Sequence, residues 1–211
     1  MGTPGFFLTF EGTDGVGKTT HVKLVKRWLE SRGVRVCLTR EPGGGPVAEK
    51  IRRILLNPHL KISGLTELFL YEAARADHVE TVIGPARRQG KVVVCDRFSD
   101  ATVAYQGAAR GLDRETILLL NRIATRGVMP HLTLILDLPP RQGLAKAKAR
   151  RSLGQGDRLE NEGLRFQERV RRGYLALAKR EPRRVKIVRV QPTIEETQKL
   201  IRQIICRKMG L

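Results

Sequence analysis

The residues Gly12-Thr-Asp-Gly-Val-Gly-Lys-Thr19 have the spacing of a loop that binds the phosphates of a nucleotide. Glycines let backbone N–H groups turn inward around phosphate oxygens, and the following helix N-terminus adds a partial positive charge. In such a loop Lys18 reaches the β- and γ-phosphates, and the Thr19 hydroxyl is a ligand for Mg²⁺. We therefore predict a site for ATP with Mg²⁺, formed by Gly12, Thr13, Asp14, Gly15, Val16, Gly17, Lys18, Thr19 and Thr20.

A second motif, Lys91-Val-Val-Val-Cys-Asp96, is an apolar strand that ends in an acid. In nucleotide-binding proteins this pattern places a carboxylate next to the metal ion. Many buried strands end in Asp, so the motif gains its meaning from the phosphate loop earlier in the chain. We predict that Asp96 lies beside Thr19 at the metal site.

The phosphate loop contains no Arg and no Lys other than Lys18. Phosphoryl transfer spreads negative charge over oxygens that cations must offset. The Lys- and Arg-rich segment 141–158 has the composition of a mobile lid, which would supply Arg150 or Arg151 and exclude water from the site. The alternative is that this segment is a solvated basic helix.

The elements that must position these residues alternate between strands and helices. Strands are expected at 6–11, 34–39, 91–95, 132–138 and 185–190, and helices at 18–32, 46–56, 66–88, 114–125, 164–179 and 193–207. Because each strand is apolar throughout, the pattern predicts a parallel sheet with helices on both faces. We predict an α/β fold in which residues 1–211 form a single domain around five parallel strands.

The net charge is +19, from 40 Lys and Arg against 21 Asp and Glu. A field of this size attracts polyanions, but few aromatic residues interleave with the basic ones. Solvated helix faces are the simpler interpretation, and nucleic acid is not an expected partner. The three cysteines lack metal-site spacing, no apolar stretch approaches the ~20 residues of a membrane span, and the N-terminus has no secretory pattern. We expect a cytoplasmic protein without a membrane partner.

Several motifs, taken in their order along the chain, resemble those of the bacterial thymidylate kinases. They are Phe10-Glu-Gly-Thr-Asp-Gly-Val-Gly-Lys-Thr-Thr20, Thr39-Arg-Glu-Pro-Gly-Gly44, Ala73-Ala-Arg75, Asp96-Arg-Phe98, Ala104-Tyr-Gln-Gly107 and Asp157-Arg-Leu-Glu160. The resemblance covers nearly the whole chain and implies the P-loop nucleoside monophosphate kinase fold. It also implies transfer of the ATP γ-phosphate to dTMP, giving dTDP and ADP in dTTP biosynthesis, and a homodimer.

The same resemblance implies a role for each matching residue. Lys18, Arg97, the lid residue Arg150 and Arg158 would be catalytic, with Asp157 and Arg158 also anchoring the lid cation. The dTMP site would comprise Asp14 and Glu41 on the sugar side, Tyr71 stacked on the base, Arg75 donating to a thymine carbonyl, Arg97 on the phosphate, Thr102 at the base edge, Tyr105 against the deoxyribose and Gln106 beside it.

Some positions depart from the family pattern. Gly45 stands where the family typically has Thr, Ala101 where it often has Ser, and Lys146 and Lys148 where it often has Arg. The loop 190–193 departs from the family pattern, so no residue is assigned to adenine. Two other functions stay open at this point: a P-loop kinase for another nucleotide, and a catalytically inactive relative that binds polyanions. Phosphorylation of a panel of monophosphates distinguishes between them.

Overall fold

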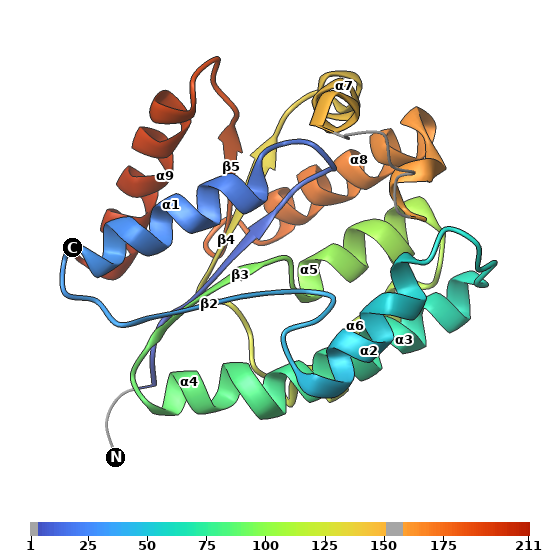
Figure 1. Cartoon of the computed structure of the whole chain (residues 1–211), viewed down its shortest axis with the longest axis horizontal. Helices are drawn as coiled ribbons and strands as arrows, with labels where there is room; N and C mark the ends of the chain where they lie inside the picture. The colour runs from blue at the N-terminus through green and yellow to red at the C-terminus, as the bar shows by residue number, and fades with distance from the viewer. Residues whose placement is uncertain (1–3, 151–157) are drawn as a thin grey trace.

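The structure, a computed structural model, describes residues 4–150 and 158–211 (Figure 1). Its centre is a five-stranded parallel sheet with the strand order β2-β3-β1-β4-β5. The strands are β1 (Phe7–Glu11), β2 (Val36–Arg40), β3 (Val92–Asp96), β4 (Leu132–Asp137) and β5 (Val185–Arg189). The predicted five-stranded parallel sheet is confirmed.

Helices connect the strands and cover both faces of the sheet. They are α1 (Lys18–Glu30), α2 (Pro46–Leu56), α3 (Gly64–His78), η1 (Val79–Ile83), α4 (Gly84–Arg88), α5 (Ser99–Thr102), η2 (Val103–Ala109), α6 (Arg114–Thr125), α7 (Pro140–Arg150), η3 (Glu160–Glu162), α8 (Leu164–Arg180) and α9 (Ile194–Met209). Along β1, Leu8 and Phe10 pack against α1 and α9, whereas Phe7 packs against η1 and α4. Because both faces are covered, the inner strands β1, β3 and β4 are buried along nearly all of their length and are mostly apolar, whereas the edge strand β5 exposes Lys186 and Arg189. No helix in these described ranges is long and apolar enough to cross a membrane.

The parallel strands bring their polar ends to one edge of the sheet. Asp96 at the end of β3 is in register with Phe10 of β1 and with Arg40 of β2. Glu11 ends β1 directly before the phosphate loop, and Asp137 ends β4. Charged groups that are distant in sequence therefore meet at the edge where α/β proteins bind ligands.

Three segments differ from the sequence expectation. The expected helix 66–88 is α3 and α4 joined by the π-helical segment η1, in which Gly84 N–H donates to Val79 O. The helical turns of α5 and η2 were not predicted, although they carry much of the acceptor side of the site. The expected lid segment 141–158 begins within helix α7, and residues 151–157 lie outside the described residues.

Gly45 has a structural explanation in the start of helix α2. Asp77, on α3, accepts hydrogen bonds from Val47 N (3.1 Å) and Ala48 N (2.9 Å), the first free amides of α2. A Cβ on Gly45 would collide with the Asp77 carboxylate. The capping group that α2 needs thus comes from a neighbouring helix, and a side chain at position 45 would displace it.

Candidate active site

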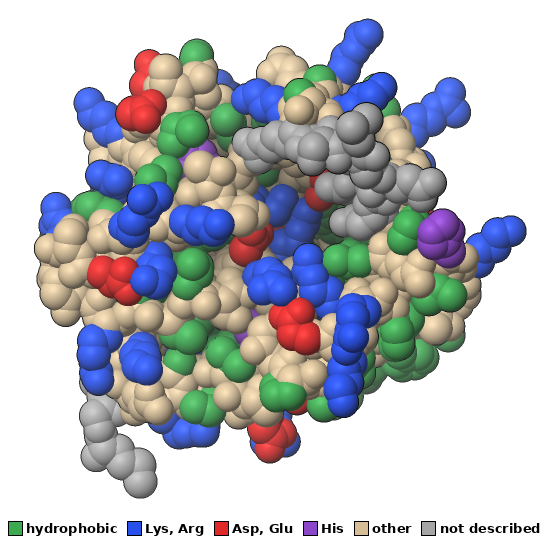
Figure 2. Space-filling view, in the orientation of Figure 1, with side chains coloured by type: hydrophobic (Ala, Val, Ile, Leu, Met, Phe, Trp, Pro, Cys, Tyr) green, Lys and Arg blue, Asp and Glu red, His purple; other side chains and the backbone are tan. Residues whose placement is uncertain are grey.

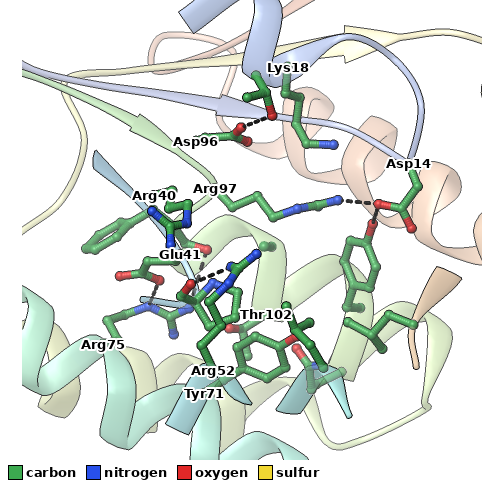
Figure 3. A pocket seen from close by; sticks show the side chains of 18 of the residues that line it. Asp14, Lys18, Arg40, Glu41, Arg52, Tyr71, Arg75, Asp96, Arg97 and Thr102 are labelled. Atoms are coloured by element: carbon green, nitrogen blue, oxygen red, sulfur yellow. Dashed lines mark hydrogen bonds and ion pairs between the residues drawn. The ribbon is translucent and has the colours of Figure 1, made fainter. Parts of the chain in front are cut away.

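A cavity of about 380 Å³ opens at the polar edge of the sheet, between the phosphate loop, β2, α3 and η2. Figure 2 shows it as a hollow where basic and acidic side chains meet, and Figure 3 shows its lining. Most of the predicted site residues line it, namely Asp14, Gly15, Gly17, Lys18, Thr19, Glu41, Tyr71, Arg75, Asp96, Arg97, Thr102, Tyr105 and Gln106. Gly12, Thr13, Val16, Thr20 and Arg158 are not part of this lining.

The phosphate loop holds Lys18 without a carboxylate partner among the described residues. Its Nζ donates to Gly12 O at 3.1 Å and to Thr13 O at 2.8 Å. Gly12, Gly15 and Gly17 have backbone φ angles of 138°, 75° and 93°, which residues other than glycine rarely adopt. Burial, followed by the nearby charge of Arg97, lowers the pKa of Lys18 to about 8. The loop therefore presents a cation whose charge is not yet neutralised.

Thr19 and Asp96 lie side by side, as predicted. The Thr19 hydroxyl donates to Asp96 Oδ2 at 2.7 Å (Figure 3). In the described parts of the chain no group of three or more His, Cys, Asp and Glu could hold a metal. Mg²⁺ bound with a nucleotide needs only one or two protein oxygens, since phosphates and water supply the rest. An oxygen pair of this kind fits that ion.

Arg97 is held from several sides with its backbone in an unusual conformation. Its φ is 71°, the left-handed region that a residue with a Cβ enters at a cost of about 1–2 kcal/mol. Its Nη2 lies 2.6 Å from Asp14 Oδ1, its Nη1 donates to Gly12 O (3.1 Å) and Tyr174 OH (3.3 Å), and its guanidinium stacks over Tyr105. These contacts fix the cation between the phosphate loop and the acceptor side.

Arg75 is 1% exposed and is surrounded by acceptors. Its Nε donates to Glu41 at 2.9 Å, and its Nη1 donates to Glu72 at 2.6 Å and to Asn121 at 2.8 Å. Burial alone would lower the pKa of Arg75, but Glu41 and Glu72 reverse this and raise it above its ordinary value. The other carboxylate oxygen of Glu41 lies 3.0 Å from His78 Nδ1. Arg75 and Glu41, both predicted as site residues, therefore belong to one network of polar contacts in the cavity wall.

Gln106 and Arg158 meet at a buried acid outside the cavity centre. Glu67 is fully buried and accepts from Gln106 Nε2 at 2.7 Å, while Arg158 Nη2 and Arg110 Nη2 lie 2.5 Å and 3.1 Å from it. Arg158 Nε also donates to Leu55 O at 3.0 Å. Arg158 therefore ties the last residue of the lid segment to α2 and α3. Its role as the anchor of the lid cation stays a prediction.

The backbone of Gly143, in the lid helix α7, lies close to the backbone of the phosphate loop. A Cβ on Gly15 would collide with the carbonyl oxygen of Gly143, and a Cβ on Gly143 would approach the carbonyl of Asp14. The side chain of Arg150, at the end of α7, and residue Arg151 lie outside the described residues. The choice between them as the lid cation stays a prediction.

Sequence reasoning missed three polar residues at this site. Arg40 and Arg52 line the cavity, and Arg52 Nη1 donates to Pro42 O at 2.6 Å (Figure 3). Glu11 is fully buried beneath the loop, where it accepts from Phe98 N and Tyr174 OH, both at 2.7 Å. Burial, followed by the charge of Asp100, raises the pKa of Glu11 to about 8. An acid in an otherwise apolar strand was the one signal for Glu11.

Known proteins resemble this chain along nearly all of its length. The family model for thymidylate kinase matches residues 10–201. The chain is 51% identical over 195 residues to a thymidylate kinase from Syntrophotalea carbinolica, with 90% of each protein covered. It is 48% identical over 209 residues to one from Geobacter sp. (strain M21), covering 97% of this chain and 93% of that protein.

A solved structure agrees with the sequence relatives. The crystal structure of thymidylate kinase from Ehrlichia chaffeensis superposes with a TM-score of 0.77 at 34% identity, covering 96% of this chain and 99% of that one. The phosphate loop, the fold and the relatives lead to one conclusion: this chain is an ATP-dependent nucleoside monophosphate kinase and belongs to the thymidylate kinase family.

Proposed function

We propose that this site transfers the γ-phosphate of ATP to the 5′-phosphate of dTMP, giving dTDP and ADP. The observation that carries the proposal is the position of Arg97, between Lys18 of the donor loop and the wall formed around Arg75 in a single cavity. A forked guanidinium there suits an acceptor phosphate that must face the donor. Catalysis rests on positioning and charge neutralisation, without a covalent intermediate.

The acceptor would bind with its base toward α3 and its sugar toward the phosphate loop. Tyr71 offers a flat face for stacking, Arg75 a donor for a thymine carbonyl, and Thr102 and Gln106 polar groups at the base edge. Asp14 would accept from the sugar 3′-hydroxyl, with Glu41 on the same side, and Tyr105 would pack against the ring carbon that carries no hydroxyl in a deoxynucleotide.

Thr19 and Asp96 are the residues that would hold Mg²⁺ together with the ATP phosphates. When bound, the ion supplies positive charge to the β- and γ-phosphate oxygens. The residues of the chain act around it: Lys18 binds the same phosphates, and the loop amides orient them. Arg150, or Arg151, would complete the set of cations when α7 closes over the site.

A panel of acceptors tests the proposal directly. Purified protein is incubated with ATP, Mg²⁺ and one of dTMP, dUMP, dCMP, AMP or GMP, and ADP release is measured. We expect dTMP to give by far the highest kcat/KM. A clear preference for AMP or GMP contradicts the proposal, and failure with every acceptor favours an inactive relative.

We further propose that two copies form a homodimer. The neighbouring helices α2, α3 and α6 expose large apolar side chains, among them Ile54, Leu65, Phe69, Leu119 and Ile123. Phe69 and Ile123 are 53% and 63% exposed, and Figure 2 shows hydrophobic side chains gathered over α2 and α3. An apolar surface of this kind marks a protein interface.

The variant Phe69→Lys tests the dimer, because it places a charge in the apolar surface. Light scattering after size exclusion should give a dimer for the native chain and a monomer for the variant, with Leu164→Lys as a control on another exposed apolar residue. A monomeric native chain contradicts this proposal.

We also propose a cytoplasmic location, since Cys37, Cys95 and Cys206 are all unpaired.

A further inference from the structure

Helix α8 presents polar side chains to the active-site edge of the sheet from its buried face. Gln167, Arg171 and Tyr174 follow one another at i, i+4 and i+7, so they lie on the same side of the helix. Arg171 forms a two-point contact with Asp137 at the end of β4, at 2.7 Å and 2.9 Å. Helix α8 follows the lid segment after η3, so this face joins the chain beyond the lid to the edge of the sheet.

Gln167 contacts Asp14 of the phosphate loop at two points. Its Nε2 donates to Asp14 Oδ2 at 2.7 Å, and its Oε1 lies 3.4 Å from Asp14 N, which donates to it. Gln167 is fully buried, and 153 residues separate it from Asp14. Gln167 thus restrains Asp14 at two places, its side-chain carboxylate and its backbone N–H.

The contacts of Asp14 leave little choice for a ligand. Arg97 Nη2 and Tyr105 OH lie 2.6 Å and 3.3 Å from Asp14 Oδ1. A carboxylate offers about two acceptor positions on each oxygen. Among the described residues, Oδ1 therefore has both positions taken, while Oδ2 has one taken by Gln167. The open position on Oδ2 is the one that a ligand hydroxyl can use, and its direction depends on Gln167.

We propose that Gln167 is a positioning residue that aims Asp14 at the acceptor sugar and thereby sets the preference for an acceptor with a 3′-hydroxyl. The inference rests on the proposed function, in which Asp14 accepts from that hydroxyl. Gln167 suits this role because its amide donates to a carboxylate without adding a charge. A Glu at this position would place two carboxylates in contact, and an aliphatic residue would leave Asp14 free to turn.

The test compares dTMP with 3′-deoxythymidine monophosphate, which lacks only the hydroxyl in question. The variant Gln167→Met removes both hydrogen bonds and nearly conserves volume, and Gln167→Asn keeps an amide but withdraws it by one methylene. The matched control is Gln198→Met, since Gln198 is also a buried helical glutamine but contacts His21, away from the cavity. For each protein, kcat/KM is measured with both acceptors.

We expect the native enzyme and Gln198→Met to prefer dTMP. Gln167→Met should lose about tenfold in kcat/KM for dTMP, the scale of one hydrogen bond to a charged group, with little change for the 3′-deoxy acceptor. If Gln167→Met does not fold, Gln167→Asn should show the same loss of preference.

An unchanged preference in a folded Gln167 variant overturns the inference and leaves the proposed function intact. An equal fall with both acceptors also overturns it, because that result indicates a structural role. A native enzyme that phosphorylates dTMP without preferring it over the 3′-deoxy acceptor overturns the inference together with the Asp14 contact. A native enzyme that does not phosphorylate dTMP overturns both the inference and the proposed function.

Discussion

The donor loop and the acceptor wall face one cavity, but they hold their cations differently. Lys18 in the loop donates to backbone carbonyls. Arg75 in the wall lies within ion-pair distance of Glu41 and Glu72. Arg97, between the two regions, contacts both a carbonyl and the carboxylate of Asp14.

The positive charge of Lys18 is therefore available to a bound ligand, whereas that of Arg75 is already neutralised by acids within the fold. An unneutralised cation gains its interaction energy when phosphate arrives, so its loss should appear in catalysis. A cation that is already neutralised by buried acids stabilises the fold, and its loss leaves those acids without a partner. Donor-loop variants should therefore be stable and inactive, and acceptor-wall variants should be unstable.

Lys18→Ala should give the largest effect. We expect kcat/KM to fall by at least about a thousandfold, since the charge on the transferred phosphate loses its partner. The midpoint of thermal unfolding should stay close to that of the native chain, because no described carboxylate loses an ion pair. Lys26→Ala, which removes an exposed cation of the same helix, is the control. A large loss of stability in Lys18→Ala contradicts the expectation that donor-loop variants keep the stability of the native chain.

Arg75→Met should lower the free energy of unfolding by about 3–5 kcal/mol, because two buried carboxylates lose their counter-charge. Denaturant unfolding measures this change. Arg126→Ala removes an exposed arginine paired with Glu80 and should cost less than about 1 kcal/mol. If Arg75→Met is as stable as the control and only its turnover falls, Arg75 acts in catalysis and not in stability, which contradicts the proposed difference between the two regions.

Arg97→Ala should show both effects, with catalysis dominant. We expect about a hundredfold loss in kcat/KM for dTMP, the scale of one lost transition-state contact. Arg126→Ala is again the matched control, since Arg126 also has a positive φ, of 51°, but is exposed. Activity within about twofold of the native enzyme would place Arg97 outside the reaction and contradict the proposed function.

The pH dependence of binding should also separate the two regions. Lys18 has a pKa lowered to about 8 by burial, so the free enzyme loses this charge as pH rises from 7 to 9. ATP binding, measured by calorimetry, should weaken above pH 8 and approach about tenfold per pH unit. Arg75 has a raised pKa and keeps its charge, so its part in dTMP binding should not change over this range. ATP affinity that is constant between pH 7.5 and 9.5 contradicts the unneutralised state of Lys18.

The smallest effect concerns the support of the acceptor wall by α2. Asp77→Ala removes the cap of this helix and should cost about 1 kcal/mol of stability. Gly45→Thr alone should also destabilise the fold, because its side chain meets Asp77. In the double variant the Asp77 carboxylate no longer meets the introduced side chain, whose hydroxyl can cap α2 once the Thr81 hydroxyl turns away from it. We therefore expect the two effects to be less than additive in denaturant unfolding. Simple additivity contradicts this account of Gly45.

The same division explains how far the sequence predicted the site. The donor loop is contiguous in sequence, so the types and spacing of its glycines, Lys18 and Thr19 were enough to predict a phosphate-binding site. The acceptor residues such as Arg75 and Tyr105 were assigned through the family resemblance. Two supporting residues come from distant segments: Glu11 accepts from Tyr174, and Gln167 contacts Asp14. No local pattern in the sequence marks that these residues will meet.

Secondary structure followed the same rule. The inner strands β1, β3 and β4 are mostly apolar and end in an acidic residue, and all five strands lie close to their predicted positions. Helix α7 was not predicted because its sequence, rich in Ala, Lys and Arg, has little apolar periodicity. The η2 turns, which carry Tyr105 and Gln106, are stabilised by packing against α8 rather than by their own sequence.

The burial of acids has a consequence for how copies of this protein meet. The net charge is +19, and Glu11, Glu41, Glu67, Glu72 and Asp100 all lie inside the fold, whereas most of the described Lys and Arg side chains do not, so the surface is strongly positive. Two such molecules repel one another over about 10 Å in 0.1 M salt, a distance that shrinks as salt is added. Adding salt should therefore tighten the proposed dimer through its apolar helices, while it weakens the encounter with anionic nucleotides.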